Sequence, residues 1–367
     1  MIFLKKKYVW ISCIILLLVG GVFFANKQQV ANPVNTTETS TRTIVDQLGR
    51  TVTIPKEPKR IVCLQHHTLD IILELQAGDK LVGVVNKWQS LVSPELGEIY
   101  PRLKELPTPG DLKSVNVEEL SKLNPDLVLV THYIDKSVID KIEKMGIPVV
   151  AISLYKAEYE EAAKLNPQLK NPDKAYTEGF VEGVTLIGNI VGKEDKATEL
   201  INYTLKNREL VTTRLASMAK DTKPVTVYMA NPDMYTYGTG KYVGTMMERA
   251  GTHNVAENID GYSQVTMEQI MQWNPEVIFV QSRYEKLVDE IRMNPAWQNI
   301  AAVKNGKVLV APEYTKPWGH PCPESMALGE LWLAKTFYPQ QFADIDMKQK
   351  VNEFYTKFYG VPYTGKL

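Results

Sequence analysis

The sequence VNVEELSKLNPDLVLV at residues 115–130 is echoed by VTMEQIMQWNPEVIFV at residues 265–280, at a constant offset of 150 positions. In both copies a glutamate lies in the first turn of a predicted helix, an Asn-Pro pair ends that helix, and an apolar run predicts a buried strand. The helix–Asn-Pro–strand junction is common by itself. The aligned acid and strand at one fixed offset favour an internal repeat, and two related units predict two lobes of similar architecture.

Helices and strands alternate through both units, which is typical of a mostly parallel sheet with helices on both faces. The sequence therefore predicts an α/β protein with an N-terminal lobe at residues 42–190 and a C-terminal lobe at residues 221–367. Between them, residues 194–219 contain no Gly or Pro. A helix of this length spans roughly 39 Å, so we expect a single long α-helix within residues 191–220 to join the lobes as a rigid strut.

The N-terminus has the features of an export segment. Residues 1–25 combine Lys5, Lys6 and Lys7 with an apolar stretch that begins at Tyr8, and a basic start before an apolar core is typical of an export signal. This segment serves either as a cleaved signal or as a retained anchor. Residues 26–41 are polar and predict a flexible linker. The basic end predicts a cytoplasmic N-terminus, with the folded part periplasmic or on the outer face of the cytoplasmic membrane.

Composition excludes several classes of function. Lys plus Arg and Asp plus Glu each total 42, so the formal net charge is zero. This balance argues against a nucleic-acid partner, which a basic face would attract. Beyond the export segment only Cys63 and Cys322 remain, too few for a disulfide framework and without zinc-finger spacing. Cys322 lies between two prolines, and we expect it to be exposed.

The chain resembles the periplasmic binding proteins that serve iron-siderophore, haem and cobalamin import. The resemblance covers about residues 42–360 and is carried by TRTIVDQLGRTVTIPKEPKRIV at 41–62, by the two repeat copies, and by NPAWQNIAAVKNGKVLV at 294–310. It implies the substrate-binding subunit of an ABC importer, not an enzyme. We expect a monomer without a cofactor of its own, whose partners are a membrane permease and its ATPase.

The resemblance also implies that one exposed glutamate in each lobe docks on arginines of the permease. By position these residues are Glu118 and Glu268, and a carboxylate so placed can form a bidentate pair with an arginine. The alternative is that acids favour helix N-termini simply because of the helix dipole.

Candidate ligand-binding side chains follow the predicted strands. In open α/β sheets ligands bind beyond the carboxyl ends of the strands, and two facing lobes would line one cleft with those ends. Four of the five histidines and many aromatic residues fall there. The predicted ligand-binding residues are His66, His67, Trp88, His132, Tyr133, Tyr235, Tyr237, Arg283, Tyr284, Trp318 and His320.

This set predicts a metal chelate as the cargo, with an iron(III)-siderophore as the first candidate. Imidazoles or phenolates could fill open coordination positions, His66, His67, His132 and His320 being the possible metal ligands, and Arg283 suits an anionic chelate. A corrinoid, haem, or a nickel or cobalt complex remains open. A secreted metal-dependent hydrolase is a rival interpretation, but the chain contains no HExxH or GxSxG motif.

Overall fold

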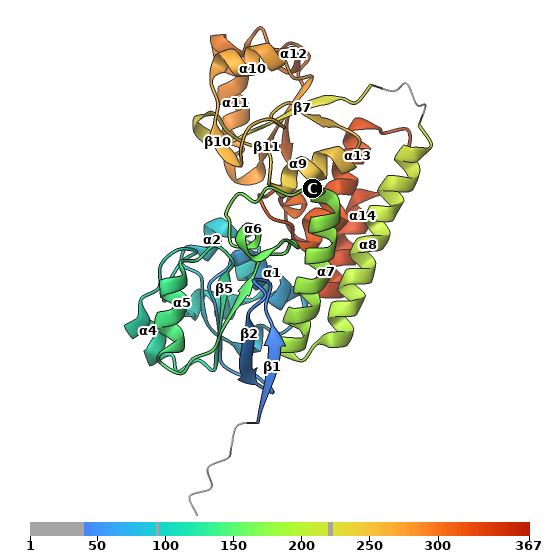
Figure 1. Ribbon diagram of the computed structural model, residues 1–367. Coiled ribbons are helices and arrows are strands. Elements are labelled where there is room, and N and C mark those ends of the chain that lie inside the picture. The colour runs from blue at the N-terminus through green and yellow to red at the C-terminus, as the bar shows by residue number, and fades with distance from the viewer. Residues whose placement is uncertain (1–39, 93–94, 219–222) are drawn as a thin grey trace, which may run out of the picture. The chain divides into compact units, whose positions relative to one another are not determined.

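The computed structural model describes residues 40–92, 95–218 and 223–367 (Figure 1). The predicted export segment and residues 26–39 of the predicted linker lie outside this part of the chain. Among the helices that it contains, none is both long and apolar enough to span a membrane.

The first lobe is built on a parallel four-stranded sheet in the order β4-β3-β5-β6. An antiparallel hairpin of β1 and β2 precedes it, turning at Gly49, whose φ of 75° suits glycine. The elements are β1 (Thr41–Val45), β2 (Thr51–Pro55), β3 (Ile61–Cys63), α1 (His66–Glu74), β4 (Leu81–Val84), α2 (Trp88–Leu91), α3 (Leu96–Ile99), α4 (Val117–Lys122), β5 (Leu127–Thr131), α5 (Lys136–Glu143), β6 (Val149–Ile152) and α6 (Tyr159–Ala162).

The second lobe carries a parallel sheet in the order β9-β7-β11-β12 and a short antiparallel pair, β8 and β10. Its elements are β7 (Thr226–Ala230), β8 (Tyr235–Tyr237), α9 (Tyr242–Arg249), β9 (His253–Asn254), β10 (Tyr262–Gln264), α10 (Met267–Trp273), β11 (Val277–Gln281), α11 (Lys286–Met293), α12 (Ala301–Lys304) and β12 (Val308–Ala311). The repeated segments form α4 with β5 and α10 with β11, at equivalent positions in the two sheets. The predicted fold class is therefore confirmed.

The connector between the lobes consists of two long helices, α7 and α8, where the sequence predicted a single one. Helix α7 (Pro172–Val191) ends at Gly192, which adopts a left-handed φ of 67°, and α8 (Glu194–Ala216) then packs along α7. Helix α8 corresponds to the strut predicted within residues 191–220. Near the middle of α7, Gly179 lies so close to the backbone of Tyr155 that an added Cβ would fall 2.1 Å from its Cα. This glycine allows the connector to pack tightly against the first lobe.

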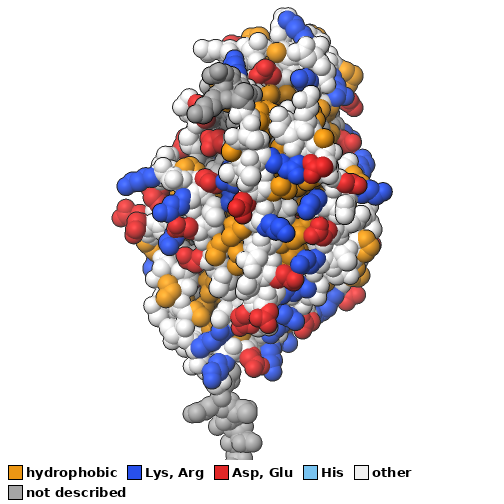
Figure 2. All heavy atoms as spheres, turned by 90° about the vertical axis from the view of Figure 1, so that its right-hand side faces the viewer, with side chains coloured by type: hydrophobic (Ala, Val, Ile, Leu, Met, Phe, Trp, Pro, Cys, Tyr) orange, Lys and Arg blue, Asp and Glu red, His pale blue; other side chains and the backbone are white. Residues whose placement is uncertain are grey.

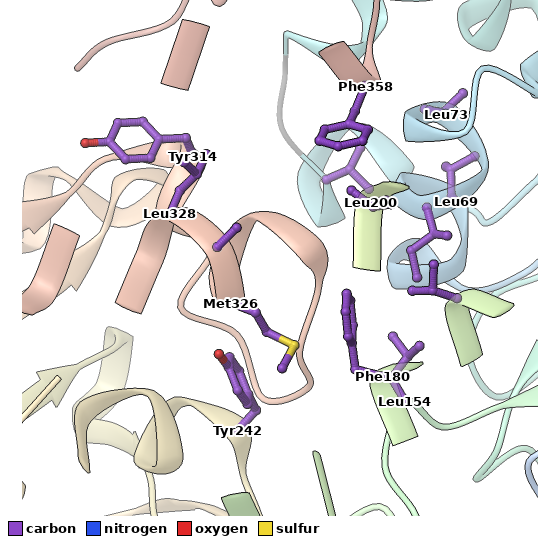
Figure 3. Packing of buried hydrophobic residues seen from close by; sticks show 14 of the residues in the cluster. Leu69, Leu73, Leu154, Phe180, Leu200, Tyr242, Tyr314, Met326, Leu328 and Phe358 are labelled. Carbon is purple, nitrogen blue, oxygen red and sulfur yellow. The ribbon is translucent and has the colours of Figure 1, made fainter. Parts of the chain in front are cut away.

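The C-terminal helices pack on the connector. After a π-helical segment (Ser325–Gly329) come α13 (Glu330–Phe337) and α14 (Met347–Phe358). The ring of Tyr203 on α8 lies 5.8 Å from Phe354 and 5.5 Å from Phe358 of α14. One buried apolar cluster includes Leu69 of α1, Phe180 of α7 and Tyr242 of α9 (Figure 3). A shared core of this kind holds the connector and both lobes together.

The exposed face that contains α8 shows Lys and Arg side chains interspersed with Asp and Glu (Figure 2). Charges of both signs alternate there without a single-sign patch on this face. That distribution agrees with the zero net charge of the chain.

A buried charge network links α7, α8, α9 and α13. Glu330 is fully buried and accepts hydrogen bonds from Arg208 Nε (3.0 and 3.1 Å), Tyr242 Oη (2.7 Å) and Arg249 Nε (2.8 Å). Asp173 accepts from Arg208 Nη2 at 2.8 Å and from Arg249 Nη1. Two guanidinium groups therefore share two carboxylates where the connector meets the second lobe.

We expect Glu330→Gln to destabilise the fold by about 3 kcal/mol or more, because removing one partner from a buried ion pair leaves the other charge uncompensated. Chemical denaturation followed by circular dichroism would measure the shift of the midpoint. The matched control is Asp344→Asn, which breaks the exposed pair with Arg214 and should cost about 1 kcal/mol or less. Equal shifts for the two variants would contradict a structural role for the buried network.

Candidate functional site

Side chains from both lobes meet where the parallel strands end. His66 and His67 open α1 shortly after β3, and His132 directly follows β5. The loop after β12 brings the ring of His320 to 5.5 Å from His67 and 5.0 Å from His132. Trp318 of the same loop lies 5.6 Å from His66 and 5.3 Å from His67. Four imidazoles thus form one cluster at the junction of the two lobes.

Burial favours the neutral form of these imidazoles. It lowers the pKa of His66 to about 3, and two nearby cations act in the same direction. It also lowers the pKa of His132 to about 3, against the effect of two backbone carbonyls. The pKa values of His67 and His320 are lowered as well, first by burial and then by neighbouring imidazoles and lysines. Each neutral ring offers one N–H donor and one lone pair.

Three of the four imidazoles carry ring nitrogens without a protein partner. Within the described residues, Nδ1 of His66, Nδ1 of His67 and both ring nitrogens of His320 are buried and make no hydrogen bond. His132 differs, because its Nδ1 lies 3.3 Å from the carbonyl oxygen of Ile152 and its Nε2 lies 3.2 Å from that of Lys164. Buried polar atoms normally have partners. The unpartnered nitrogens of His66, His67 and His320 are therefore available to a ligand, whereas the two carbonyl contacts of His132 fix the position of its ring.

Two cations reach from the second lobe to the backbone of the first. Arg283, which follows β11, donates from Nε to Oε1 of Gln281 at 2.8 Å and from Nη1 to the carbonyl oxygen of Ser90 at 3.3 Å. Lys241, at the N-cap of α9, donates from Nζ to the carbonyl oxygen of Leu165 at 2.5 Å. Burial lowers the pKa of Lys241 to about 8, so most of its charge is retained at neutral pH. The imidazoles therefore lie between positive groups.

A cavity of about 660 Å³ opens beside the cluster and is lined by residues of both lobes. Ser90 and Leu91 contribute from the first lobe, and Arg283, Tyr284 and Trp318 contribute from the second. The guanidinium of Arg283 lies 5.5 Å from the Trp318 ring and 5.7 Å from the Tyr284 ring. Trp318 connects this cavity to His66 and His67, but none of the four imidazoles is among its lining residues. Glu95, Glu285 and Glu313 line it together with Arg283 and Lys366.

Of the other predicted site residues, two tyrosines lie beside the imidazole cluster and a third packs elsewhere. Tyr133 stacks on His320 with 6.3 Å between ring centroids. Tyr237 lines the site, since an added Cβ at Gly319 would fall 3.3 Å from its ring. Tyr235 instead stacks on Tyr262 at 5.0 Å in the β8–β10 pair.

Trp88 is also apart from the imidazole cluster. Its indole packs over Gly97, where an added Cβ would fall 3.1 Å away, and it belongs to the buried apolar core. The structure therefore places Trp88 in the interior of the first lobe.

The donor set does not form a recognisable metal centre. Within the described residues, no group of three or more His, Cys, Asp or Glu side chains is placed to hold a metal ion. Cys63 and Cys322 are both free and buried. The expectation that Cys322 is exposed is wrong, because its backbone N–H and its thiol both bond inward to the Ser325 hydroxyl, at 2.9 and 3.4 Å.

Sequence patterns did not identify three polar residues around the cluster. Lys241, Gln281 and Lys316 are all buried. Gln281 could have been suspected as the last residue of a predicted strand. Lys241 and Lys316 look like ordinary surface residues in the sequence. They become buried only because the two lobes pack together.

The two predicted docking glutamates occupy matching places. Glu118 is exposed in the first turn of α4, whose N-cap Asn116 accepts from the Glu118 backbone N–H at 3.1 Å. Glu268 is exposed in the first turn of α10, which a Thr266–Gln269 capping box begins. Among the ion pairs formed by the described residues, neither carboxylate takes part.

Known proteins are similar to this chain in sequence and in fold. Residues 61–315 match the family described as periplasmic binding protein. The molybdate-binding protein MolA of Haemophilus influenzae is 47% identical over 323 residues, which are 88% of this chain and 92% of that protein. The Fe(3+)-citrate-binding protein YfmC of Bacillus subtilis is 26% identical, over 74% of this chain and 78% of that one.

Solved structures agree with the sequence comparison. MolA of Haemophilus influenzae bound to molybdate has a TM-score of 0.85 at 46% identity, covering 89% of this chain and 100% of that one. CeuE of Helicobacter pylori has a TM-score of 0.67 at 18% identity, covering 88% and 96% of the two chains. The second likeness concerns the fold alone.

Proposed function

Since this chain belongs to the periplasmic binding protein family, we propose that it captures a molybdate-class oxyanion and delivers it to an ABC importer. The family consists of substrate-binding transport proteins. The proposed cargo is an oxyanion. It replaces the iron(III)-siderophore, which was the first candidate from the residues after the predicted strands.

The observation that carries this proposal is the pairing of unpartnered imidazoles with cations. Buried ring nitrogens of His66, His67 and His320 lack acceptors, and an oxyanion would accept hydrogen bonds from their N–H groups. Arg283 and Lys241 exert positive fields on His66 and His320 respectively. Positive charge at this point favours an anion and disfavours a bare metal cation.

The start of α1 supports the same cargo. His66 and His67 are the first two residues of this helix, and no side chain caps its N-terminus. The first N–H groups of a helix lack intrahelical partners, and the helix dipole favours negative charge at that end. A small dianion could thus accept hydrogen bonds from backbone and side chains together.

A metal chelate is the second candidate. The relative YfmC is described as binding Fe(3+)-citrate, and such a chelate is also anionic. Tyr133, Tyr237 and Trp318 would offer aromatic surface to a larger ligand. A cavity of about 660 Å³ could hold either ligand, so it is the 47% identity to MolA that favours the compact oxyanion.

Delivery would require contact with a membrane permease and its ATPase. We assign that contact to Glu118 and Glu268, one on each lobe. The export features of residues 1–25 would place the protein on the outer side of the cytoplasmic membrane, cleaved or held by that segment.

The proposal is tested by calorimetric titration of the full chain with molybdate, tungstate, sulfate, phosphate, iron(III) citrate and an iron(III)-siderophore. We expect saturable binding of molybdate and tungstate, and much weaker binding of sulfate and phosphate. Binding of either iron chelate without binding of any oxyanion would overturn the proposed cargo.

A further inference from the structure

A second constellation of charges lies in the interior beside the imidazoles. Lys316, in the loop after β12, is fully buried and donates from Nζ to Oε1 of Glu324 at 2.5 Å. The same ammonium lies 3.1 Å from Oδ2 of Asp70 on α1. Tyr359 donates from its hydroxyl to Oε1 of Glu324 at 2.6 Å. Glu74, one helical turn after Asp70, is also fully buried.

This cluster lies close to the candidate site, both along the chain and in space. Asp70 comes four residues after His66 on α1, and residues so spaced are neighbours on one helix face. Lys316 comes two residues before Trp318, and its ammonium lies 5.3 Å from the Trp318 ring. The positive charge of Lys316 also acts on both His66 and His67. A change of charge in the cluster will therefore change the electrostatic potential at the site.

Among Lys316, Asp70, Glu74 and Glu324 there is one base and there are three acids. Burial raises the pKa of Glu74 well above its usual value, and the adjacent carboxylate of Glu324 raises it further. Both effects favour the protonated form of Glu74, which lies within hydrogen-bonding reach of Glu324. The pKa of Glu324 is lowered on balance, because Lys316 and its hydrogen bonds outweigh burial. The ammonium and the Glu324 carboxylate then cancel, which leaves Asp70 to decide the net charge.

Asp70 is poorly neutralised. Apart from the ion pair with Lys316, neither of its carboxylate oxygens has a hydrogen-bond partner within the described residues. Burial raises its pKa to about 7, although Lys316 opposes this shift. Charged and titratable groups from several elements face Asp70 or its cluster. They are Lys316, Glu313, Cys322 and Glu324 from the segment after β12, Glu74, His66 and His67 from α1, Cys63 from β3, Tyr100 after α3, and Tyr355, Tyr359 and Tyr363 from α14 and the residues after it.

We propose that capture of the oxyanion is coupled to protonation of Asp70, so that the buried cluster of Asp70, Lys316 and Glu324 sets the affinity of the site. This inference rests on the proposed oxyanion cargo. A bound dianion repels an ionised Asp70 and favours its protonated form. By linkage, a protonated Asp70 favours the bound dianion to the same degree.

The expected pH response has a definite sign. Below pH 7 Asp70 is already protonated, and the anion binds without proton uptake. As pH rises through 7 the carboxylate ionises, and the affinity falls by up to about tenfold per pH unit. The imidazoles do not produce this response in the free protein, since the pKa values of His66 and His132 lie near 3. Lys241, with a pKa of about 8, adds a separate loss of affinity at higher pH.

The test is calorimetric titration of the full chain with molybdate at pH 6, 7 and 7.5, in pairs of buffers with different heats of ionisation. For the wild type we expect proton uptake near pH 7 and weaker binding at pH 7.5 than at pH 6. Asp70→Asn should lose the proton uptake, show a nearly flat affinity from pH 6 to 7.5, and bind more tightly than the wild type at pH 7.5. Glu74→Gln is the matched control, because an amide resembles the protonated carboxyl, and it should retain the wild-type pH response.

The outcomes separate the two proposals. A wild type that binds no oxyanion overturns the cargo, and the coupling with it. If the wild type binds molybdate but Asp70→Asn retains its proton uptake, the imidazoles accept the proton and only the coupling is overturned. Should Asp70→Asn fail to fold, the wild-type measurement still decides, since binding without proton uptake at pH 7 contradicts the coupling.

Discussion

Replacing Arg283 by glutamine is expected to weaken oxyanion binding by about a hundredfold. The side chain carries an exposed guanidinium at the mouth of the cavity, oriented by Gln281 and reaching the Ser90 carbonyl of the other lobe. Each hydrogen bond to a charged group contributes about 1.5–3 kcal/mol. Losing a bidentate pair therefore costs about 3 kcal/mol, and each 1.4 kcal/mol is a factor of ten in the dissociation constant.

Calorimetry of this variant needs a control that removes the same charge elsewhere. Arg292→Gln serves, because Arg292 lies in the same lobe and donates to the carbonyl oxygen of Val308, outside the cluster. We expect its affinity to stay within about threefold of the wild type, since exposed charges at a distance are screened. Arg283→Lys should be intermediate, because lysine keeps the charge but not the planar fork. If Arg283→Gln and Arg292→Gln lowered the affinity for the oxyanion equally, the net charge of the protein, and not contact with Arg283, would determine the affinity.

The fold could be predicted because its signals are local and repeated. The echo at residues 115–130 and 265–280 became α4 with β5 and α10 with β11, at equivalent positions of the two sheets. The absence of Gly and Pro within residues 194–219 likewise predicted α8. Packing of α14 along α8 could not be seen in the sequence, because it depends on contacts such as Tyr203 with Phe354, which are far apart in the chain.

The clustering of the candidate site residues was predictable in outline for a topological reason. Residues after parallel strands meet at one sheet edge, and this rule brings His66 and His132 together in the first lobe. His320 follows a strand of the other sheet and joins them because the two lobes face each other. It does not say which nitrogens remain free. His132 was a candidate metal ligand, but carbonyl oxygens lie within 3.3 Å of both its nitrogens. Coordination through His132 would first require those contacts to break.

Buried charge was the main feature that sequence patterns missed. A lysine is usually at the surface, and nothing near Lys316 in the sequence marks it as an exception. Its partners Asp70 and Glu324 come from α1 and from the segment before the π-helix. Their convergence depends on the way the loop after β12 folds back across the first lobe. The same folding buries Cys322.

Replacing both Glu118 and Glu268 by alanine is expected to abolish uptake while leaving the affinity for molybdate unchanged. The repeat places one exposed carboxylate in the first turn of α4 and one in the first turn of α10. Both N-termini are capped by other residues, Asn116 and Thr266, so neither glutamate serves as an N-cap. Each carboxylate is free to form a bidentate pair with an arginine of a partner.

The measurement combines uptake of molybdate by cells that express the importer with calorimetry of the purified variant. Glu119→Ala with Glu290→Ala provides the matched control, because it removes one exposed acid from each lobe: Glu119 follows Glu118 on α4, and Glu290 lies on α11, away from Glu268. We expect each single variant at Glu118 or Glu268 to retain partial uptake, since one lobe can still dock. A pairing of surface charges with arginines is weakened by salt, so in reconstituted vesicles the wild type should lose transport at high ionic strength before it loses binding. If the double variant lost affinity as much as uptake, the two glutamates would belong to the binding site and not to the docking surface.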